Sequence, residues 1–300
     1  MCGIVGLHLR EPALYPRLGS LITRMLGQVV ERGPDSAGVA VYGDPAMNPA
    51  GTTAVSLLTG GLSAAEIADA VAARLPGDVT LGRYDAGQTV VLSAPVDADL
   101  LIDAARAAVP ACTVVGHGEQ VAVLKGVGNP LGLAEEFGLE RARGWQAVSH
   151  TRMATESAVT PQGSHPFSVG PGQCLVHNGS FSNHATIRRE LRAEGVEFDS
   201  ENDSEVGARF VAHHLARGAG LEKALRMLCE RFDGFYTLLV STQDSFAVVR
   251  DAIACKPAVV AETTQWVAMA SEYRALAGLP GVEDARIFEP EPEEVYVWQR

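Results

Sequence analysis

Apolar residues recur at helical spacing in one segment near the start of the chain. The members of this stripe are Leu18, Leu21, Ile22, Met25, Leu26, Val29 and Val30. The spacing predicts a helix, which Gly33-Pro34 ends. Before it, the apolar residues within 4–7 predict a strand that opens at the beginning of the chain, and a further short strand is predicted over residues 39–42.

Residues 53–143 have a pattern of their own. Ser63 and Glu66 form a capping-box pair at the start of a predicted helix. The further elements predicted here are a strand over 89–92, a helix over 97–108 and a strand over 121–124. We interpret the segment as a small α/β subdomain inserted into one domain that spans residues 1–300. A packing or partner-contact role is the interpretation we favour over a second active site, because its only histidine is His117 in a Gly-rich turn.

The chain after Trp145 predicts helices placed before and between runs of short strands. The predicted helices cover about 183–194, 203–216 and 220–231. The predicted strands cover 147–149, 173–176, 235–241, 246–250, 258–261 and 266–270. This order indicates an α+β fold in which sheets pack face to face with helices outside.

Composition narrows the class of protein. The chain has 300 residues with 47% hydrophobic content, and no apolar run reaches membrane-spanning length. The start lacks the basic region of a signal peptide, so we expect a soluble, cytoplasmic protein with no membrane partner. A formal charge of −12 without a basic patch argues against nucleic acid. Five cysteines without paired spacing argue against a disulfide framework and a zinc site.

The second residue is a cysteine, and this position gives it chemical meaning. Removal of Met1 is expected before a small residue and would leave a thiol and a free α-amine on Cys2. An α-amine has a pKa near 8, so it takes up the thiol proton more readily at neutral pH than a lysine does. A cysteine at position 2 is often incidental, and other residues must decide between these alternatives.

Five short blocks occur in a characteristic order. They are Met1-Cys2-Gly3-Ile4-Val5-Gly6, Arg32-Gly33-Pro34-Asp35-Ser36-Ala37-Gly38, His150-Thr151-Arg152-Met153-Ala154-Thr155, His177-Asn178-Gly179 and Asn202-Asp203-Ser204-Glu205. Together they resemble the signature blocks of class II glutamine amidotransferases. The resemblance implies a four-layer αββα sandwich of the N-terminal-nucleophile (Ntn) hydrolase type.

The resemblance also implies roles for single residues. Cys2 is the expected nucleophile, and Asn178 and Gly179 are expected to stabilise the oxyanion of the tetrahedral intermediate. The residues expected to bind glutamine are Arg152, Asp203, Thr151 and Thr155. Of these, Arg152 suits the α-carboxylate and Asp203 the α-ammonium.

Taken singly, most of these residues have simpler interpretations. Asn178-Gly179 is typical of a turn, Asp203 of a helix N-terminus and Arg152 of a surface loop. Residues 32–38 either shape the glutamine pocket or only terminate a helix. Met153 departs from the family, where an aromatic residue is usual.

A metal site is a weaker hypothesis. His150, His165 and His177 are predicted on separate loops without a short ligand motif, so no metal is expected.

The whole-chain pattern most resembles the stand-alone amidotransferase subunit of glutamate-synthase-like enzymes, including N-methylglutamate synthase. Glutamine is the implied substrate. The implied partners are a β-helix subunit and a subunit that carries FMN and iron–sulfur clusters, and no cofactor is expected in this chain. The chain ends about thirty residues after Ser271-Glu272, which leaves no room for an acceptor domain. Two alternatives are an Ntn hydrolase that acts on another amide and a weakly active regulatory or binding subunit.

Overall fold

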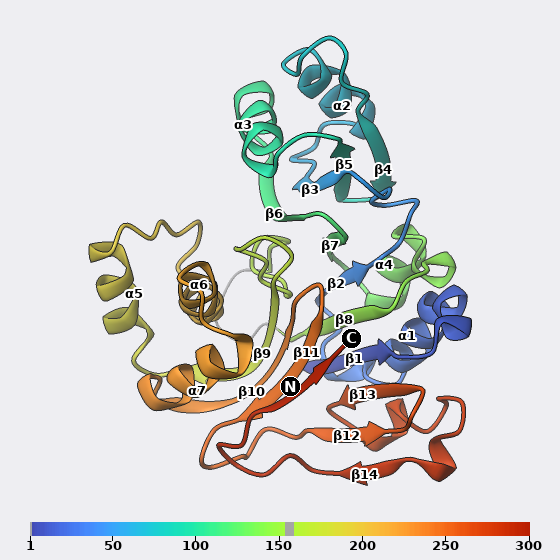
Figure 1. Ribbon diagram of the computed structural model, residues 1–300, viewed down its shortest axis with the longest axis vertical. Coiled ribbons are helices and arrows are strands. Elements are labelled where there is room, and N and C mark those ends of the chain that lie inside the picture. Colours follow the sequence, from blue (N-terminus) through green and yellow to red (C-terminus); the bar gives the residue numbers. More distant parts are fainter. Residues whose placement is uncertain (1, 154–158) are drawn as a thin grey trace.

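The computed structural model describes residues 2–153 and 159–300. Within them, a large sheet runs in the strand order β14-β12-β13-β1-β8-β2-β7, and its adjacent strands pair antiparallel (Figure 1). Its strands are β14 (Arg286–Phe288), β12 (Val259–Glu262), β13 (Trp266–Ala270), β1 (Gly3–Leu9), β8 (Gln146–Arg152), β2 (Ser36–Tyr42) and β7 (Val121–Val127). The strand predicted at the start of the chain is therefore central in the large sheet.

A second sheet packs against the large one. In the described residues its order is β15-β11-β10-β9, with β9 at one edge. These strands are β15 (Tyr296–Gln299), β11 (Ser245–Arg250), β10 (Gly234–Ser241) and β9 (Cys174–Phe181). Buried side chains that include Ile4, Val176 and Phe246 fill the space between the two sheets.

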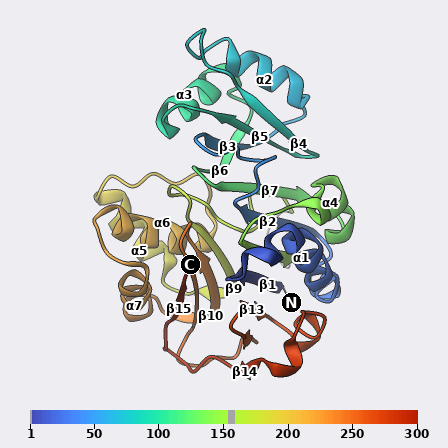
Figure 2. The ribbon, with the colours of Figure 1, turned by 45° about the vertical axis from the view of Figure 1, so that its right-hand side comes forward.

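Helices cover the outer face of each sheet (Figures 1 and 2). The helices α5 (His184–Ala193), α6 (Asp203–Ala216) and α7 (Leu221–Arg231) cover the second sheet, while α1 (Leu18–Gly27) and α4 (Pro130–Glu136) cover the large one. The result is a four-layer αββα sandwich, which confirms the predicted α+β class and its layering.

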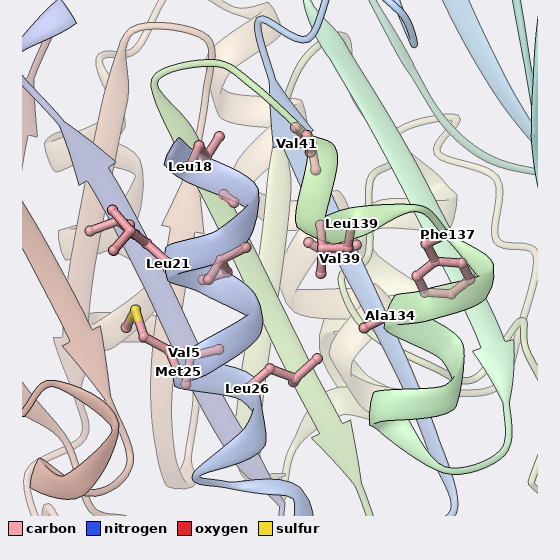
Figure 3. Close-up of a cluster of buried hydrophobic side chains, with 14 of the residues drawn as sticks. Val5, Leu18, Leu21, Met25, Leu26, Val39, Val41, Ala134, Phe137 and Leu139 are labelled. Carbon is pink, nitrogen blue, oxygen red and sulfur yellow. The ribbon is translucent and has the colours of Figure 1, made fainter. Parts of the chain in front are cut away.

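The α1 helix shows how the apolar stripe is used. Leu18, Leu21 and Met25 are at most 1% exposed and lie in one core cluster with Val5 of β1 and Leu139 (Figure 3). Burial of each such side chain contributes roughly 1.5–3 kcal/mol. This packing fixes α1 over the strand that begins directly after Cys2.

A small sheet stands apart at one end of the molecule, where Figure 1 draws it at the top. Its order in the described residues is β4-β5-β3-β6. The strands are β4 (Gly82–Ala86), β5 (Thr89–Ala94), β3 (Thr53–Leu58) and β6 (Thr113–Gly118), and the helices α2 (Ala64–Ala72) and α3 (Ala98–Ala108) pack with them. The predicted capping box is present at α2.

The segment 53–143 therefore does not form a single unit. Its part up to Gly118 makes the small sheet, whereas β7 pairs with β2 along the edge of the large sheet and α4 packs near α1. The sequence pattern did not reveal this division, because the pairing of β7 with β2 joins strands that are far apart in the chain. None of the helices within 2–153 and 159–300 has the length and apolar character needed to cross a membrane.

Candidate active site

Antiparallel pairing of β1 with β8 places Cys2 beside the end of β8. Gly3 lies opposite Thr151 in this register. The Cys2 thiol is partly exposed, and its Sγ lies 4.0 Å from the carbonyl oxygen of Met153. The sequence blocks that contain Cys2 and Met153, which are about 150 residues apart in the chain, therefore meet at this thiol.

The backbone carbonyl of Cys2 accepts two hydrogen bonds from side chains. Arg32 Nε donates at 3.1 Å and Asn178 Nδ2 donates at 3.3 Å. Arg32 is in turn held by Glu272, whose Oε1 lies 2.8 Å from Arg32 Nη1. The hydrogen bond from Arg32, aided by Arg274, holds the pKa of Glu272 below its usual range. The sequence pattern indicated Arg32 as part of a pocket wall and did not reveal its direct contact with the nucleophile residue.

Two hydroxyl groups fix the first residues of β1. Thr151 Oγ1 accepts from Gly3 N at 3.2 Å and donates to Val29 O at 3.2 Å. Ser271 Oγ accepts from Ile4 N at 2.9 Å. Thr151 is fully buried, so its observed contacts position the backbone next to Cys2. The expected contact between Thr151 and substrate stays a prediction.

Asn178 and Gly179 lie on the edge strand β9. Gly179 is exposed and has φ +143°, which a residue with a side chain rarely adopts. A Cβ atom there would lie 1.9 Å from the carbonyl oxygen of Phe235. The block is therefore part of a strand rather than a turn, and glycine is required for β10 to approach.

Asp203 is the first residue of α6, and Asn202 caps this helix through its side chain. One carboxylate oxygen of Asp203 accepts from the backbone N–H of Phe181 at 2.9 Å. This bond ties the helix start to β9, two residues after Gly179. Asp203 thus joins the strand that carries both expected oxyanion donors.

Arg152 is 7% exposed at the end of β8 and lies opposite Ser36 of β2. Gly33 packs against this strand end so closely that a Cβ atom would lie 2.4 Å from the carbonyl carbon of Thr151. Met153 is 40% exposed beside Cys2, where the family usually has an aromatic residue. Thr155, the other expected glutamine contact, lies outside the described residues.

The prediction that the three histidines lie on separate loops was wrong for two of them, and only His165 lies on a loop. His150 lies on β8 and His177 on β9, and both side chains are buried. The ring of His165 lies 4.3 Å from that of His150 and 6.3 Å from that of His177. Burial lowers the pKa of His150 to about 3 and that of His177 to about 4, and it holds the pKa of His165 well below its usual range.

These histidines are therefore neutral rings behind the site. His177 Nδ1 lies 2.8 Å from Ser204 Oγ and its ring stacks on Phe181. Among the described residues, no group of three or more His, Cys, Asp or Glu side chains is arranged to hold a metal ion. Cys174 is fully buried on β9, and burial raises the pKa of its thiol to about 11. It is a core thiol.

Comparison with known proteins identifies the family of this chain. Residues 150–278 match a family described as a glutamine amidotransferase domain. The chain is also 45% identical over 298 residues to the glutamine amidotransferase-like protein GlxB of Rhizobium meliloti, and the match covers 99% of this chain and 98% of GlxB. The chain belongs to the class II glutamine amidotransferases. Cys2 agrees with the N-terminal cysteine of this class of enzyme.

Other relatives of this amidotransferase extend the comparison. A putative glutamine amidotransferase of Methanothermobacter thermautotrophicus is 29% identical, with 99% of each chain covered. Glutamine–fructose-6-phosphate aminotransferase of Xanthomonas campestris is 42% identical over 96 residues, which are 32% of this chain and 16% of that protein. The glutamine phosphoribosylpyrophosphate amidotransferase of B. subtilis has a similar fold, with a TM-score of 0.60 and 18% identity over 99% of this chain and 47% of that one. This likeness supports the Ntn-hydrolase type of fold.

Proposed function

We propose that this amidotransferase hydrolyses the side-chain amide of glutamine through a thioester on Cys2. The observation that carries the proposal is the meeting of Cys2 with Arg32 and Asn178 at the end of β8. Loss of Met1 frees the α-amine of Cys2, which takes the thiol proton. The thiolate then attacks the δ-carbon of glutamine and forms a tetrahedral oxyanion.

Asn178 and Gly179 stabilise this oxyanion in the proposal. An amide nitrogen carries two hydrogens, and in the described structure one of those on Asn178 Nδ2 donates to Cys2 O. The second is available to the oxyanion, together with the backbone N–H of Gly179. Collapse of the intermediate breaks the C–N bond and releases ammonia, and water then hydrolyses the thioester to glutamate.

Arg152 and Asp203 select glutamine in this scheme. The guanidinium pairs with the α-carboxylate, and the carboxylate of Asp203 pairs with the α-ammonium. Thr151 and Thr155 complete the substrate contacts. A site built around both charges favours an amino acid over the amide substrate of a general acylase.

The ammonia goes to a separate partner in this proposal, a glutamate-synthase-like or N-methylglutamate-synthase-like assembly. Ammonia is mostly protonated at neutral pH, so transfer without exposure to solvent preserves the reactive base. The support for this partner is the whole-chain resemblance to the stand-alone amidotransferase subunit. FMN and iron–sulfur clusters belong to the partner subunits in this scheme.

Glutamine hydrolysis by Arg152→Ala and Asp203→Ala tests the assignment. Both variants should lose at least about 100-fold in kcat/KM for glutamine, since each leaves one charge of the substrate unpaired. Neither should lose as much on an uncharged amide substrate. Equal losses on both substrates would refute the substrate roles. Co-purification from native cells, with identification of the bound subunits, tests the partner separately.

A further inference from the structure

A cavity lies where the small sheet meets the two main sheets, and we call it the junction cavity. The space inside it that water-sized groups can occupy is about 90 Å³. The walls come from α3 and β6 of the small-sheet unit, from Lys125 of β7, from Phe167, and from the segment 199–209 at the start of α6. A space of this size holds several water-sized groups, which is enough for a small ligand.

Lys125 places an amine at the wall of this cavity. The residue is 2% exposed, and the hydroxyl of Thr89 bonds both its backbone N–H and its carbonyl. Its Nζ lies 4.8 Å from the centroid of the Phe167 ring. Among the described residues it forms no ion pair within 4.0 Å, although Glu205 attracts it electrostatically from farther away. Burial lowers the pKa of this amine to about 7. Protonation of this buried amine is unfavourable unless an anion lies close by, so an anion in the cavity stabilises the charged form.

The carboxylates in the cavity wall already form hydrogen bonds and ion pairs with other residues. Glu205 accepts hydrogen bonds from Asp199 N at 2.8 Å and Ser200 N at 2.7 Å, and it pairs with Arg209 at 3.2 Å. Asp199 pairs with the same arginine at 2.6 Å. Both carboxylates are therefore held by other partners, and Glu205 offsets only part of the effect of burial on Lys125.

A second positive group lies at the mouth of the cavity. The side chain of Arg106 on α3 is exposed and makes no ion pair within the described part of the chain. The wall also includes the apolar side chains of Ile102, Val114 and Phe167. Two basic side chains together with these apolar ones fit a carboxylate carried on an apolar body.

The junction cavity is separate from the Cys2 site. Lys125, Gly38, His150 and Ile4 lie in one row across β7, β2, β8 and β1. Adjacent strands are about 4.8 Å apart, so three spacings separate Lys125 from Ile4 by about 14 Å. A ligand at Lys125 therefore does not occupy the place of glutamine.

We propose that the junction cavity binds a small organic carboxylate with an apolar body, whose negative group pairs with Lys125 and Arg106. The wall of the cavity is continuous with the segment that carries Asp203 of the glutamine site. Ser200 and Glu205 flank Asn202, which caps α6, and Asp203 is the first residue of this helix. Occupation of the cavity therefore adjusts the position of Asp203 and the KM for glutamine. This second effect rests on the proposed function, whereas the binding itself does not.

Protection of lysines from chemical labelling tests the binding. The chain has three lysines, Lys125, Lys223 and Lys256, so peptide mapping resolves each one. The full-length protein is treated with formaldehyde and cyanoborohydride in the presence of benzoate or of the neutral analogue benzamide. Benzoate should slow methylation of Lys125 at least fivefold and leave Lys223, which is exposed on α7, unchanged. Equal protection by benzamide, or no protection of Lys125 by benzoate and butyrate, would overturn the proposal.

Variants separate the site from its effect on catalysis. Benzoate should raise the Tm of the wild type and of Lys223→Met but not that of Lys125→Met. It should also change the KM for glutamine in the wild type and in Lys223→Met only. Protection of Lys125 with an unchanged KM would retain the site and refute its coupling to Asp203. If no glutamine is hydrolysed, the labelling result still decides whether the site exists.

Discussion

Arg32 and Glu272 form an ion pair of 2.8 Å, and through its Nε the same arginine holds the carbonyl of Cys2. Glu272, which is 240 positions from Arg32 in the chain, thus helps to orient the residue that carries the nucleophile. The pair is only partly exposed, with side-chain exposures of 12% and 28%. It is less screened by solvent than a surface ion pair, which makes it a positioning device.

Glu272→Gln should therefore reduce kcat for glutamine by about tenfold, roughly 1.4 kcal/mol, with little change in KM. The reason is that Arg32 loses its charged partner and holds Cys2 less firmly. The matched control is Glu262→Gln, which removes the ion pair between Arg10 and Glu262 at 2.9 Å. Steady-state kinetics of both variants is the measurement. A similar loss of kcat in the control would contradict the positioning role.

Gly179→Ala should abolish glutamine hydrolysis by more than about 100-fold in kcat, because β9 must shift and move the expected oxyanion donors. It should also cost about 1–3 kcal/mol of folding stability. Gly195→Ala is the control, since Gly195 also has a positive φ, +88°, but nothing lies within 4 Å of the position that a Cβ atom would take there. The control should lose stability alone. Denaturant unfolding and kinetics together separate the two effects.

Thr151→Val and Thr151→Ser distinguish positioning from substrate contact. Valine removes both hydrogen bonds of the hydroxyl and leaves Gly3 N–H unsatisfied, at a cost of about 1–3 kcal/mol. If the hydroxyl positions Cys2, kcat should fall in the valine variant and recover in the serine variant, with KM unchanged. A raised KM with an unchanged kcat would instead show the substrate contact that the sequence predicts.

Acid should destabilise the fold through its buried histidines. His150, His165 and His177 have lowered pKa values in the folded protein, so below the ordinary pKa of about 6.5 the unfolded chain binds protons that the folded protein does not. The stability that these neutral histidines contribute to the fold is fully present above pH 6.5 and is lost as the pH falls toward 4. In the lower part of that window, each histidine lowers the free energy of unfolding by about 1.4 kcal/mol for every pH unit of acidification. Urea unfolding between pH 4 and 7 measures how the free energy of unfolding changes with pH. This pH dependence should be shallower in His165→Leu than in the wild type, and an identical dependence would refute this origin.

The layering could be predicted from the sequence because helical and strand periodicities are local properties. The stripe from Leu18 gives α1, and the start of α6 at Asp203 follows the expected boundary. The pairing of β7 with β2 could not be predicted, since no local pattern records which strand lies at a sheet edge. Position in the sequence therefore suggested a single insertion where the structure has two parts.

The blocks predicted which segments gather around Cys2, but the contacts of two side chains could not be predicted. Thr151 is inside a recognisable block, yet its hydroxyl turns toward Gly3 and Val29 because β1 and β8 are neighbours in the sheet. Lys125 sits in an apolar strand pattern without any motif, and only the tertiary fold places its amine at a cavity. Such roles depend on the direction of a side chain in three dimensions, which residue spacing alone does not fix.

Cys2, freed of Met1, is the nucleophile in the proposed function, and intact-mass analysis of the native protein during reaction with an electrophilic glutamine analogue is the most direct test. We expect a chain that lacks Met1, a single adduct that peptide mapping places on Cys2, and ammonia release that stops as the adduct forms. In the Cys2→Ala variant neither adduct nor ammonia should appear. Full ammonia release from chains that retain Met1, or an adduct on another residue that abolishes activity, would contradict the role of Cys2.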